Sequence, residues 1–220
     1  MPLISLAAGM AIGVVLAREI GREKARRAKR LKPEAAVFLL CDVQEKFRGI
    51  IDRMPHVIAT AQAMLKCADK MGIPVVVTEQ YPKFFQATVA ELDVSKATVF
   101  AKTRFSMCTD EVVACLRAHG RRSVVLFGVE AHVCVQQTAL DLLELGYEVH
   151  VVADGVSSQR APDRATALQR IQVAGAVVTS AESVFFELLR SKEAPAFKDV
   201  SKIAKELAEA VVALGDSRLL

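Results

Sequence analysis

The chain has 220 residues, of which 52% are apolar and 25% charged, a composition that supports one sizeable α/β core. Aromatic residues make up only 5% and tryptophan is absent, which argues against a surface that stacks nucleobases. The five cysteines form no CxxC pair and no even framework, so we expect reduced thiols in an intracellular protein. The four histidines are scattered without ligand spacing, so we expect no metal site and no cofactor.

The net charge of +4 is unevenly distributed along the chain. Residues 1–32 hold eight basic and two acidic side chains, a net charge of +6, and the remainder carries 21 basic and 23 acidic ones, a net charge of −2. The basic character therefore belongs to an N-terminal leader, which we place at residues 1–35, and the domain that follows is slightly acidic.

Residues 2–17 of this leader are uncharged and mostly apolar, and a basic cluster follows them directly. This order resembles the signal anchors of the mitochondrial outer membrane and predicts membrane contact, with the folded domain on the cytosolic side. The alternative is a leader that packs onto the fold or is disordered in a cytoplasmic protein. These sixteen residues fall short of the ~20 apolar residues that span a bilayer, although tilt and snorkelling arginines can close that gap.

From residue 36 onward, apolar runs alternate with segments of helical periodicity. The expected strands cover residues 37–41, 75–78, 98–101, 123–128, 147–153 and 176–179. The expected helices cover residues 55–71, 109–118, 133–145, 163–174, 181–190 and 197–213. This alternation predicts a parallel sheet covered by helices on both faces, in a domain of residues 36–212 with a short tail at 213–220.

The most informative stretch runs from Ser123 to Thr138. Its buried strand ends at Gly128, and helical spacing begins almost at once, so Cys134 is expected in the first turn of a helix. In an open α/β sheet, ligands bind at the carboxyl ends of the strands. The helix dipole at such a position favours a thiolate. The alternative is a buried structural cysteine that packs under the sheet.

Asp42 and Lys102 also follow directly on the carboxyl ends of expected strands. Because parallel strands place those ends along one edge, we expect Asp42, Lys102 and Cys134 to converge. Together they supply the base, the positive charge and the nucleophile of covalent acyl transfer. Taken singly, each has a simpler interpretation: a turn cap, a solvated lysine and a core thiol.

Four stretches in this order resemble the isochorismatase-like cysteine hydrolase superfamily, and within it the isochorismatase-domain-containing proteins. They are Leu40–Phe47, Thr78–Pro82, Ala101–Ser106 and Gly128–Cys134. The resemblance implies a Rossmann-like three-layer α/β/α fold with a six-stranded parallel sheet in the order 3-2-1-4-5-6. It also implies a catalytic triad at Asp42, Lys102 and Cys134, a cis peptide at Val129–Glu130, and an oxyanion hole formed by the amides of Glu130 and Cys134.

Two departures from better-known relatives narrow the activity that the resemblance implies. Isochorismatases proper lack the cysteine, so Cys134 argues against their vinyl-ether chemistry. Nicotinamidases of this superfamily carry a metal-binding Asp and His set, which Asp52 and His56 do not clearly reproduce here.

We therefore expect a metal-independent cysteine hydrolase that acts on a small carbonyl or amide compound, as a homo-oligomer by family resemblance. The expected pocket residues are those near the triad motifs: Gln44, Phe47, Tyr81, Phe105 and His132. The alternatives are a catalytically silent scaffold that binds protein partners and an RNA-processing enzyme, since a few relatives have been linked to nuclease activity. The acidic domain and the sparse aromatic residues count against RNA.

Overall fold

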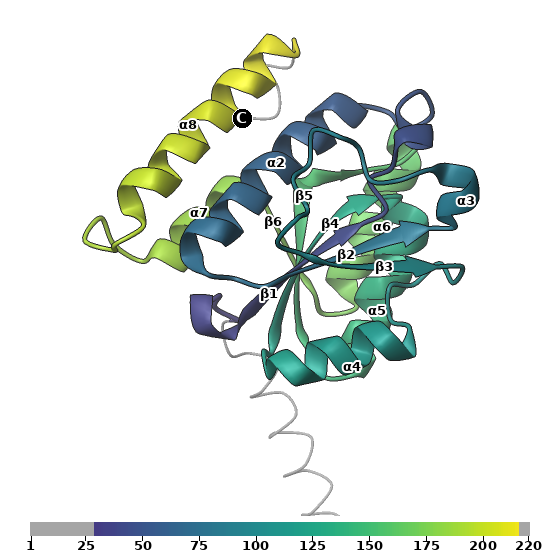
Figure 1. Cartoon of the computed structure of the whole chain (residues 1–220), viewed down its shortest axis with the longest axis horizontal. Coiled ribbons are helices and arrows are strands. Elements are labelled where there is room, and N and C mark those ends of the chain that lie inside the picture. Colours follow the sequence, from purple (N-terminus) through teal and green to yellow (C-terminus); the bar gives the residue numbers. More distant parts are fainter. Residues whose placement is uncertain (1–28, 216–220) are drawn as a thin grey trace, which may run out of the picture. The chain divides into compact units, whose positions relative to one another are not determined.

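The fold is described from a computed structural model for residues 29–215, and the expected anchor at residues 2–17 lies outside them. Six strands form a single sheet: β1 (Ala36–Cys41), β2 (Val75–Gln80), β3 (Thr98–Lys102), β4 (Ser123–Val129), β5 (Glu148–Ser157) and β6 (Val177–Thr179). Every neighbouring pair is parallel, and the order is β3-β2-β1-β4-β5-β6 (Figure 1). The strand order implied by the family resemblance is confirmed.

Helices connect the strands and cover both faces of the sheet (Figure 1). They are α2 (Met54–Met71), α3 (Pro82–Phe85), α4 (Asp110–His119), α5 (Gln136–Glu144), α6 (Ala161–Val173), α7 (Ala181–Leu189) and α8 (Phe197–Ala213). Short 3-10 turns cover Pro33–Ala35 (η1) and Glu45–Phe47 (η2), and a π-helical turn, η3, covers Ala131–Val135.

The central strand β1 is buried along its whole length because both of its faces are covered. Its side chains alternate between two apolar cores, as the period of a strand requires. Phe38 and Leu40 join the core under α2, α7 and α8, whereas Leu39 and Cys41 join the core under α4, α5 and α6. The sheet is therefore held from both sides, and its carboxyl edge is a fixed platform for side chains.

Gly128 is the position in the sheet where a side chain does not fit. It lies opposite Cys41 on β1 with a φ of +120°, and a Cβ atom there would lie 2.1 Å from the Cys41 carbonyl oxygen. A non-glycine residue would clash with the neighbouring backbone and would be strained in this conformation. The absence of a side chain at Gly128 thus lets β1 and β4 pair closely just before the residues of the candidate site.

The structure corrects three local sequence predictions. The strand expected at 75–78 is longer, because β2 continues to Gln80, and an unexpected one-turn helix, α3, begins at Pro82. The helix expected at 133–145 begins as the π-helical turn η3 and becomes α-helical at Gln136, so Cys134 lies in the π-helical turn. The strand expected at 147–153 is longer and ends at Ser157.

The folded unit begins a few residues before β1. Leu31 is fully buried, its amide donates to the Glu187 carboxylate at 2.9 Å, and its carbonyl accepts from Arg190 at 2.8 Å. Residue 31 therefore packs as part of the domain that we expected to start at residue 36. Within residues 29–215, no helix is long and apolar enough to cross a membrane.

Candidate active site

Asp42 stands at the carboxyl end of β1, where the chain leaves the sheet. Its φ of +50° is in the left-handed region, which aspartate tolerates better than most residues. This conformation breaks the alternation of the strand, so that the Asp42 carboxylate lies 3.6 Å from the Sγ of the preceding Cys41. Thr78, which pairs with Cys41 across β1 and β2, donates its hydroxyl to Asp42 Oδ1 at 2.8 Å.

Lys102 ends β3, two strands away, and reaches the same point with its amino group. The Nζ atom lies 2.6 Å from Asp42 Oδ2, 2.6 Å from Gln80 Oε1 and 3.8 Å from Cys134 Sγ. It also donates to the carbonyl oxygens of Arg104 and Phe105, at 3.1 and 3.0 Å. These contacts surround the ammonium with oxygen and sulfur atoms, so one lysine links a carboxylate and a thiol.

Cys134 arrives from β4 through the turn that follows that strand. The Val129–Glu130 peptide is cis, as the family resemblance implied, and η3 begins at the next residue. Val133 and Val135 both donate their amides to the Glu130 carbonyl at 3.1 Å. The Thr138 hydroxyl bonds the Cys134 carbonyl at 2.6 Å, which joins this turn to α5.

The three converging side chains are almost completely withdrawn from solvent. Asp42, Lys102 and Cys134 are 1%, 4% and 7% exposed. Burial raises the pKa of Asp42 above its ordinary value, although the Lys102 ammonium and the Thr78 hydroxyl oppose that shift. Burial also acts to lower the pKa of Lys102, but the neighbouring acidic groups outweigh it and raise that pKa. The site therefore holds a permanent cation beside a carboxylate that is more basic than usual.

The isochorismatase domain model matches residues 36–183 of the chain, which include all three of these side chains. The chain belongs to the isochorismatase family.

Isochorismatase domain-containing protein 1 of Danio rerio is 50% identical over 177 residues, which cover 80% of this chain and 62% of that protein. The chain thus spans less than two thirds of that relative. The structure of the MAR1 ribonuclease from Caenorhabditis elegans is 40% identical, with a TM-score of 0.77, and covers 79% of this chain and 91% of the other. The YcaC gene product of Escherichia coli, an octameric hydrolase of unknown specificity, has the same fold at 22% identity, with a TM-score of 0.75 and coverage of 86% and 94%. An oligomer of this chain stays a prediction.

Two glutamines of this isochorismatase-family domain hold the base of the site together. The side-chain Nε2 of Gln44 donates to the backbone carbonyls of Gln80 and Gln86, at 3.0 and 2.6 Å. The side-chain Oε1 of Gln44 accepts from the backbone N–H of Gln80 at 2.7 Å. Gln44 is fully buried, so its polar atoms bind protein partners in this arrangement. We expected Gln44 to bind substrate, whereas the contacts seen here position Gln80, which in turn accepts a hydrogen bond from Lys102.

The other expected pocket residues lie around the same edge of the sheet but differ in exposure. Tyr81 and Phe105 are 49% and 54% exposed. The Tyr81 amide donates to the Lys102 carbonyl at 2.7 Å, and the Phe105 carbonyl accepts from Lys102 Nζ at 3.0 Å. Phe47 instead stacks on Phe85, with ring centroids 4.7 Å apart, and packs against the core. The ring of His132 bonds the Ser158 hydroxyl at 2.9 Å, at the end of β5. Tyr81 and Phe105 are thus the members of this set that present most surface to a ligand.

Sequence reasoning missed Thr78, Gln80 and Cys41 as members of the site. Thr78 and Gln80 belong to a stretch that carried the family resemblance, and both lie at the carboxyl end of β2. Their position on the same edge as Asp42 was therefore a usable signal. Cys41 precedes Asp42 on a strand, and strand alternation placed it on the opposite side from the carboxylate.

Cys41, Asp42 and Cys134 have ligand atoms within 4.8 Å of one another, which makes them the candidate metal-binding cluster among the described residues. The Lys102 ammonium, however, already contacts two of the three. A metal cation would meet a positive charge at this point, so these residues do not fit a metal while Lys102 is protonated.

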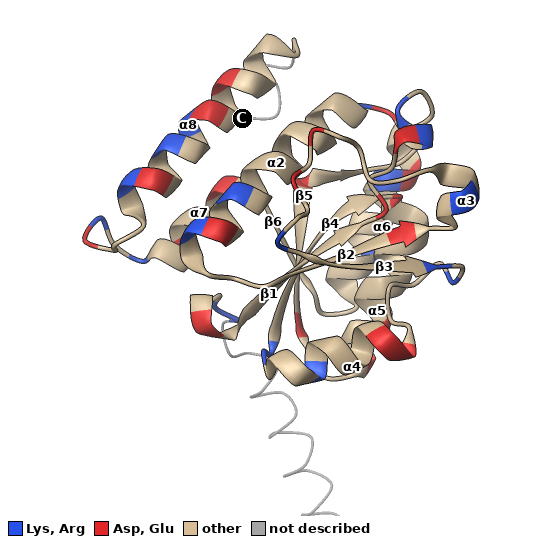
Figure 2. Cartoon of the chain, viewed as in Figure 1, with Lys and Arg blue, Asp and Glu red and all other residues tan. Residues whose placement is uncertain are grey.

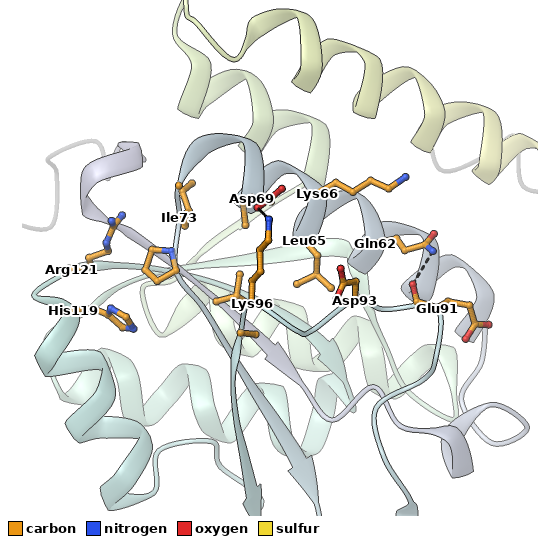
Figure 3. Close-up of a pocket in the computed structure, with 15 residues that line it drawn as sticks. Gln62, Leu65, Lys66, Asp69, Ile73, Glu91, Asp93, Lys96, His119 and Arg121 are labelled. Atoms are coloured by element: carbon orange, nitrogen blue, oxygen red, sulfur yellow. Dashed lines mark hydrogen bonds and ion pairs between the residues drawn. The ribbon is translucent and has the colours of Figure 1, made fainter.

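Two surface pockets lie at different ends of the strands. One of about 460 Å³, shown in Figure 3, is lined by residues that precede β2, β3 and β4, such as Pro74, Ala97 and Arg121. It lies at the amino end of these strands, away from the candidate site. A second of about 520 Å³ is lined by Tyr81, Lys102 and others, beside the edge strand β3, and it borders the site.

Proposed function

We propose that this chain is a cysteine hydrolase that cleaves small amides through a thioester on Cys134. The observation that supports this most directly is the position of the Lys102 amino group, 2.6 Å from Asp42 Oδ2 and 3.8 Å from Cys134 Sγ. A base, a cation and a thiol that share one secluded site are the groups that covalent acyl transfer requires.

In the first half of the reaction, Asp42 takes the proton of Cys134 and the sulfur attacks the substrate carbonyl. Burial raises the pKa of Asp42, which brings its basicity closer to neutral pH, where a general base works best. The amides of Glu130 and Cys134 donate to the oxyanion. Asp42 then returns the proton to the leaving amine, and an acyl group remains on the sulfur.

In the second half, Asp42 removes a proton from water and the hydroxide attacks the thioester carbonyl. The C–S bond then breaks, the acid leaves, and the proton returns from Asp42 to the Cys134 sulfur. Lys102 stays protonated throughout, because its acidic neighbours raise its pKa. Its role is electrostatic: it balances the charge of Asp42 and Cys134 as the proton moves between them.

The substrate is proposed to be small because Cys134 is only 7% exposed to solvent. We propose that the substrate approaches from the side of Tyr81 and Phe105, whose rings are about half exposed, and that His132 contacts it beside Cys134. The 520 Å³ pocket lined by Tyr81 and Lys102 lies on this side of the site, although Asp42 and Cys134 do not line it. Phe47 and Gln44 support this rim from behind.

The test is activity profiling over a library of small amides, with Cys134→Ala and Cys115→Ala as the paired variants. Cys115 lies partly exposed on α4 and takes no part in the site, so its variant controls for the loss of a thiol. We expect hydrolysis of at least one amide class by the wild type and by Cys115→Ala, and none by Cys134→Ala. Hydrolysis by Cys134→Ala at the wild-type rate would refute the thioester mechanism.

The similarity to the MAR1 ribonuclease, at 40% identity, favours cleavage of RNA as a second candidate function. The charge of the domain argues against it, because residues 33–220 carry a net charge of −2, and basic and acidic side chains alternate along α8 (Figure 2). RNA binding that falls steeply with salt, and that persists without the basic leader, would favour this candidate over the amide hydrolase.

A catalytically silent scaffold is the third interpretation, and thiol labelling separates it from an enzyme. A silent scaffold gives no reason for small amides to protect Cys134. We expect Cys134 to react with iodoacetamide and to be protected by the amides that the enzyme hydrolyses.

We propose further that residues 1–35 attach the domain to a membrane of the mitochondrial surface, on the strength of the apolar segment 2–17 and its basic follower. The full chain should then remain with membranes after carbonate extraction, whereas a chain that starts at Arg30 should not. Complete extraction of the full chain would show that the leader is not an anchor.

A further inference from the structure

A second thiol lies beside Cys134, at the inner side of the candidate site. The Sγ atoms of Cys41 and Cys134 and the carboxylate of Asp42 lie within 4.8 Å of one another. Cys41 is 0% exposed and Cys134 is 7% exposed. A small solute therefore reaches Cys134 before it reaches Cys41.

The fold brings these two thiols together for reasons that are visible in the sheet. Cys41 is the last residue of β1, and its side chain joins the same apolar core as Cys134. Its neighbour across the sheet is Gly128, which has no side chain. The chain leaves β4 one residue later and returns at Cys134 over the end of β1. The hydrolase mechanism does not use Cys41.

We propose that Cys41 is a resolving thiol, which condenses with Cys134 to a disulfide after a hydroperoxide has oxidised Cys134. The proposal rests on the reactive Cys134 of the proposed function, but it does not depend on what that thiol hydrolyses. The disulfide is a reversible inactive form of the enzyme, and it protects the nucleophile from irreversible oxidation.

The chemistry proceeds in two balanced steps. In the first, the Cys134 thiolate attacks the peroxide, the O–O bond breaks, an S–O bond forms, and the peroxide leaves as an alcohol or water after taking up a proton. The sulfur is oxidised to a sulfenic acid by two electrons. In the second, the Cys41 sulfur attacks the Cys134 sulfur, an S–S bond forms, the S–O bond breaks, and the hydroxyl leaves as water with the proton of Cys41.

The surroundings of Cys41 suit it to the second step and not to the first. Burial raises the pKa of Cys41 well above its ordinary value, so it remains a thiol and is a poor nucleophile toward peroxide. Its Sγ lies 3.6 Å from Asp42 Oδ2, so the carboxylate is in place to accept its proton when the sulfur attacks. The two sulfurs lie within 4.8 Å of each other and must approach to about 2 Å to bond, so disulfide formation requires the two side chains to rotate toward each other.

The proposal predicts that oxidation inactivates the site and that a thiol reductant restores its activity. A Cys41–Cys134 disulfide ties up the nucleophile, so alkylation and hydrolysis stop together. A dithiol attacks the disulfide, is itself oxidised, and returns both cysteines to thiols.

The experiment exposes the full-length wild-type protein to hydrogen peroxide, blocks free thiols and maps the cysteines by mass spectrometry without reduction. We expect a Cys41–Cys134 crosslink, a mass loss of about 2 Da for the two hydrogens, and full recovery of Cys134 alkylation with dithiothreitol. Formation of Cys134 sulfinic or sulfonic acid in the wild type as readily as in Cys41→Ser would overturn the proposal. So would a disulfide between Cys134 and any other cysteine.

Two further comparisons keep the result unambiguous. Cys41→Ser should gain about 32 or 48 Da irreversibly at Cys134, because the sulfenic acid has no partner thiol. Cys67→Ser should behave like the wild type, because Cys67 lies in the opposite core and contacts Met71. If Cys41→Ser does not fold, the wild-type crosslink map alone decides. A crosslink without amide hydrolysis would refute only the proposed function, and amide hydrolysis without a crosslink would refute only this inference.

Discussion

Replacing Lys102 with methionine tests the electrostatic centre of the site. The substitution keeps an unbranched side chain but removes the ammonium that contacts the Asp42 carboxylate at 2.6 Å. Both side chains of this pair are fully or almost fully buried, at 0% and 1% exposure. Removing one partner of a buried ion pair leaves an uncompensated charge, and this costs about 3–5 kcal/mol of unfolding free energy.

The loss should depend on pH in a direction fixed by Asp42. Burial raises the pKa of this carboxyl in the folded state, and the loss of the ammonium raises it further. A group of this kind stabilises the fold below its unfolded pKa of about 3.9, and that contribution is lost as the pH rises through the folded value. We therefore expect a larger deficit at pH 8 than at pH 5, measured by urea unfolding with unchanged m-values.

The matched control is an ion pair of similar length on the surface. Lys96 lies 2.5 Å from Asp69, but its side chain is 76% exposed, so Lys96→Met should have little effect on unfolding. The double variant Lys102→Met, Asp42→Asn should recover part of the loss, because no charge is then left buried. A deficit no larger than that of Lys96→Met, or one that does not vary with pH, would refute this account of the site.

Three other substitutions or reactions test separate parts of the structure. Iodoacetamide should label Cys134 faster than Cys115, although Cys115 is the more exposed thiol. Of these two cysteines, Cys134 alone has the base Asp42 and the cation Lys102 beside it. Peptide mass mapping over time measures the two labelling rates. Gly128→Ala should prevent stable folding, because its Cβ would lie 2.1 Å from the Cys41 carbonyl; circular dichroism and urea unfolding measure this. Leu31→Ala should lower the unfolding free energy by about 2–5 kcal/mol, because Leu31 is fully buried; urea unfolding measures this.

A different outcome would contradict each of these three expectations. Labelling of Cys115 before Cys134 would remove the evidence for an activated nucleophile. Gly146 is the control for Gly128, since its φ is also positive but nothing lies within 4 Å of its Cβ position; equal losses at both would show that contact with β1 is unimportant. An unchanged stability in Leu31→Ala would restore the domain boundary to residue 36.

Most of the sheet could be predicted from the sequence, because its strands are apolar runs that end at polar or glycine residues. Asp42, Lys102 and Cys134 could be placed at one edge, since each directly follows such a run. The strand order came from the family resemblance, because the strand and helix patterns alone leave several orders open. The roles of the three residues stay predictions that their proximity in the structure supports.

The local backbone at the site could not be predicted from periodicity. The π-helical turn at Ala131–Val135 has the same apolar spacing as the start of an ordinary helix. The left-handed conformation of Asp42 turns its carboxylate toward the Cys41 sulfur, which strand alternation excluded. Contacts such as Gln44 with Gln80 join residues 36 positions apart, so only the folded chain reveals that the Gln44 side chain bonds to the backbone of β2.

The thioester itself is the most direct test of the proposed function. An amide found by the activity profiling is mixed with the enzyme, the reaction is quenched in acid within the first turnover, and the mass of the intact chain and of the Cys134 peptide is measured. We predict an added mass equal to the acyl group on Cys134, which disappears with hydroxylamine and is enriched when water attack is slowed. Turnover of the amide with no adduct on Cys134 at any time, or an adduct on another residue, would contradict the mechanism.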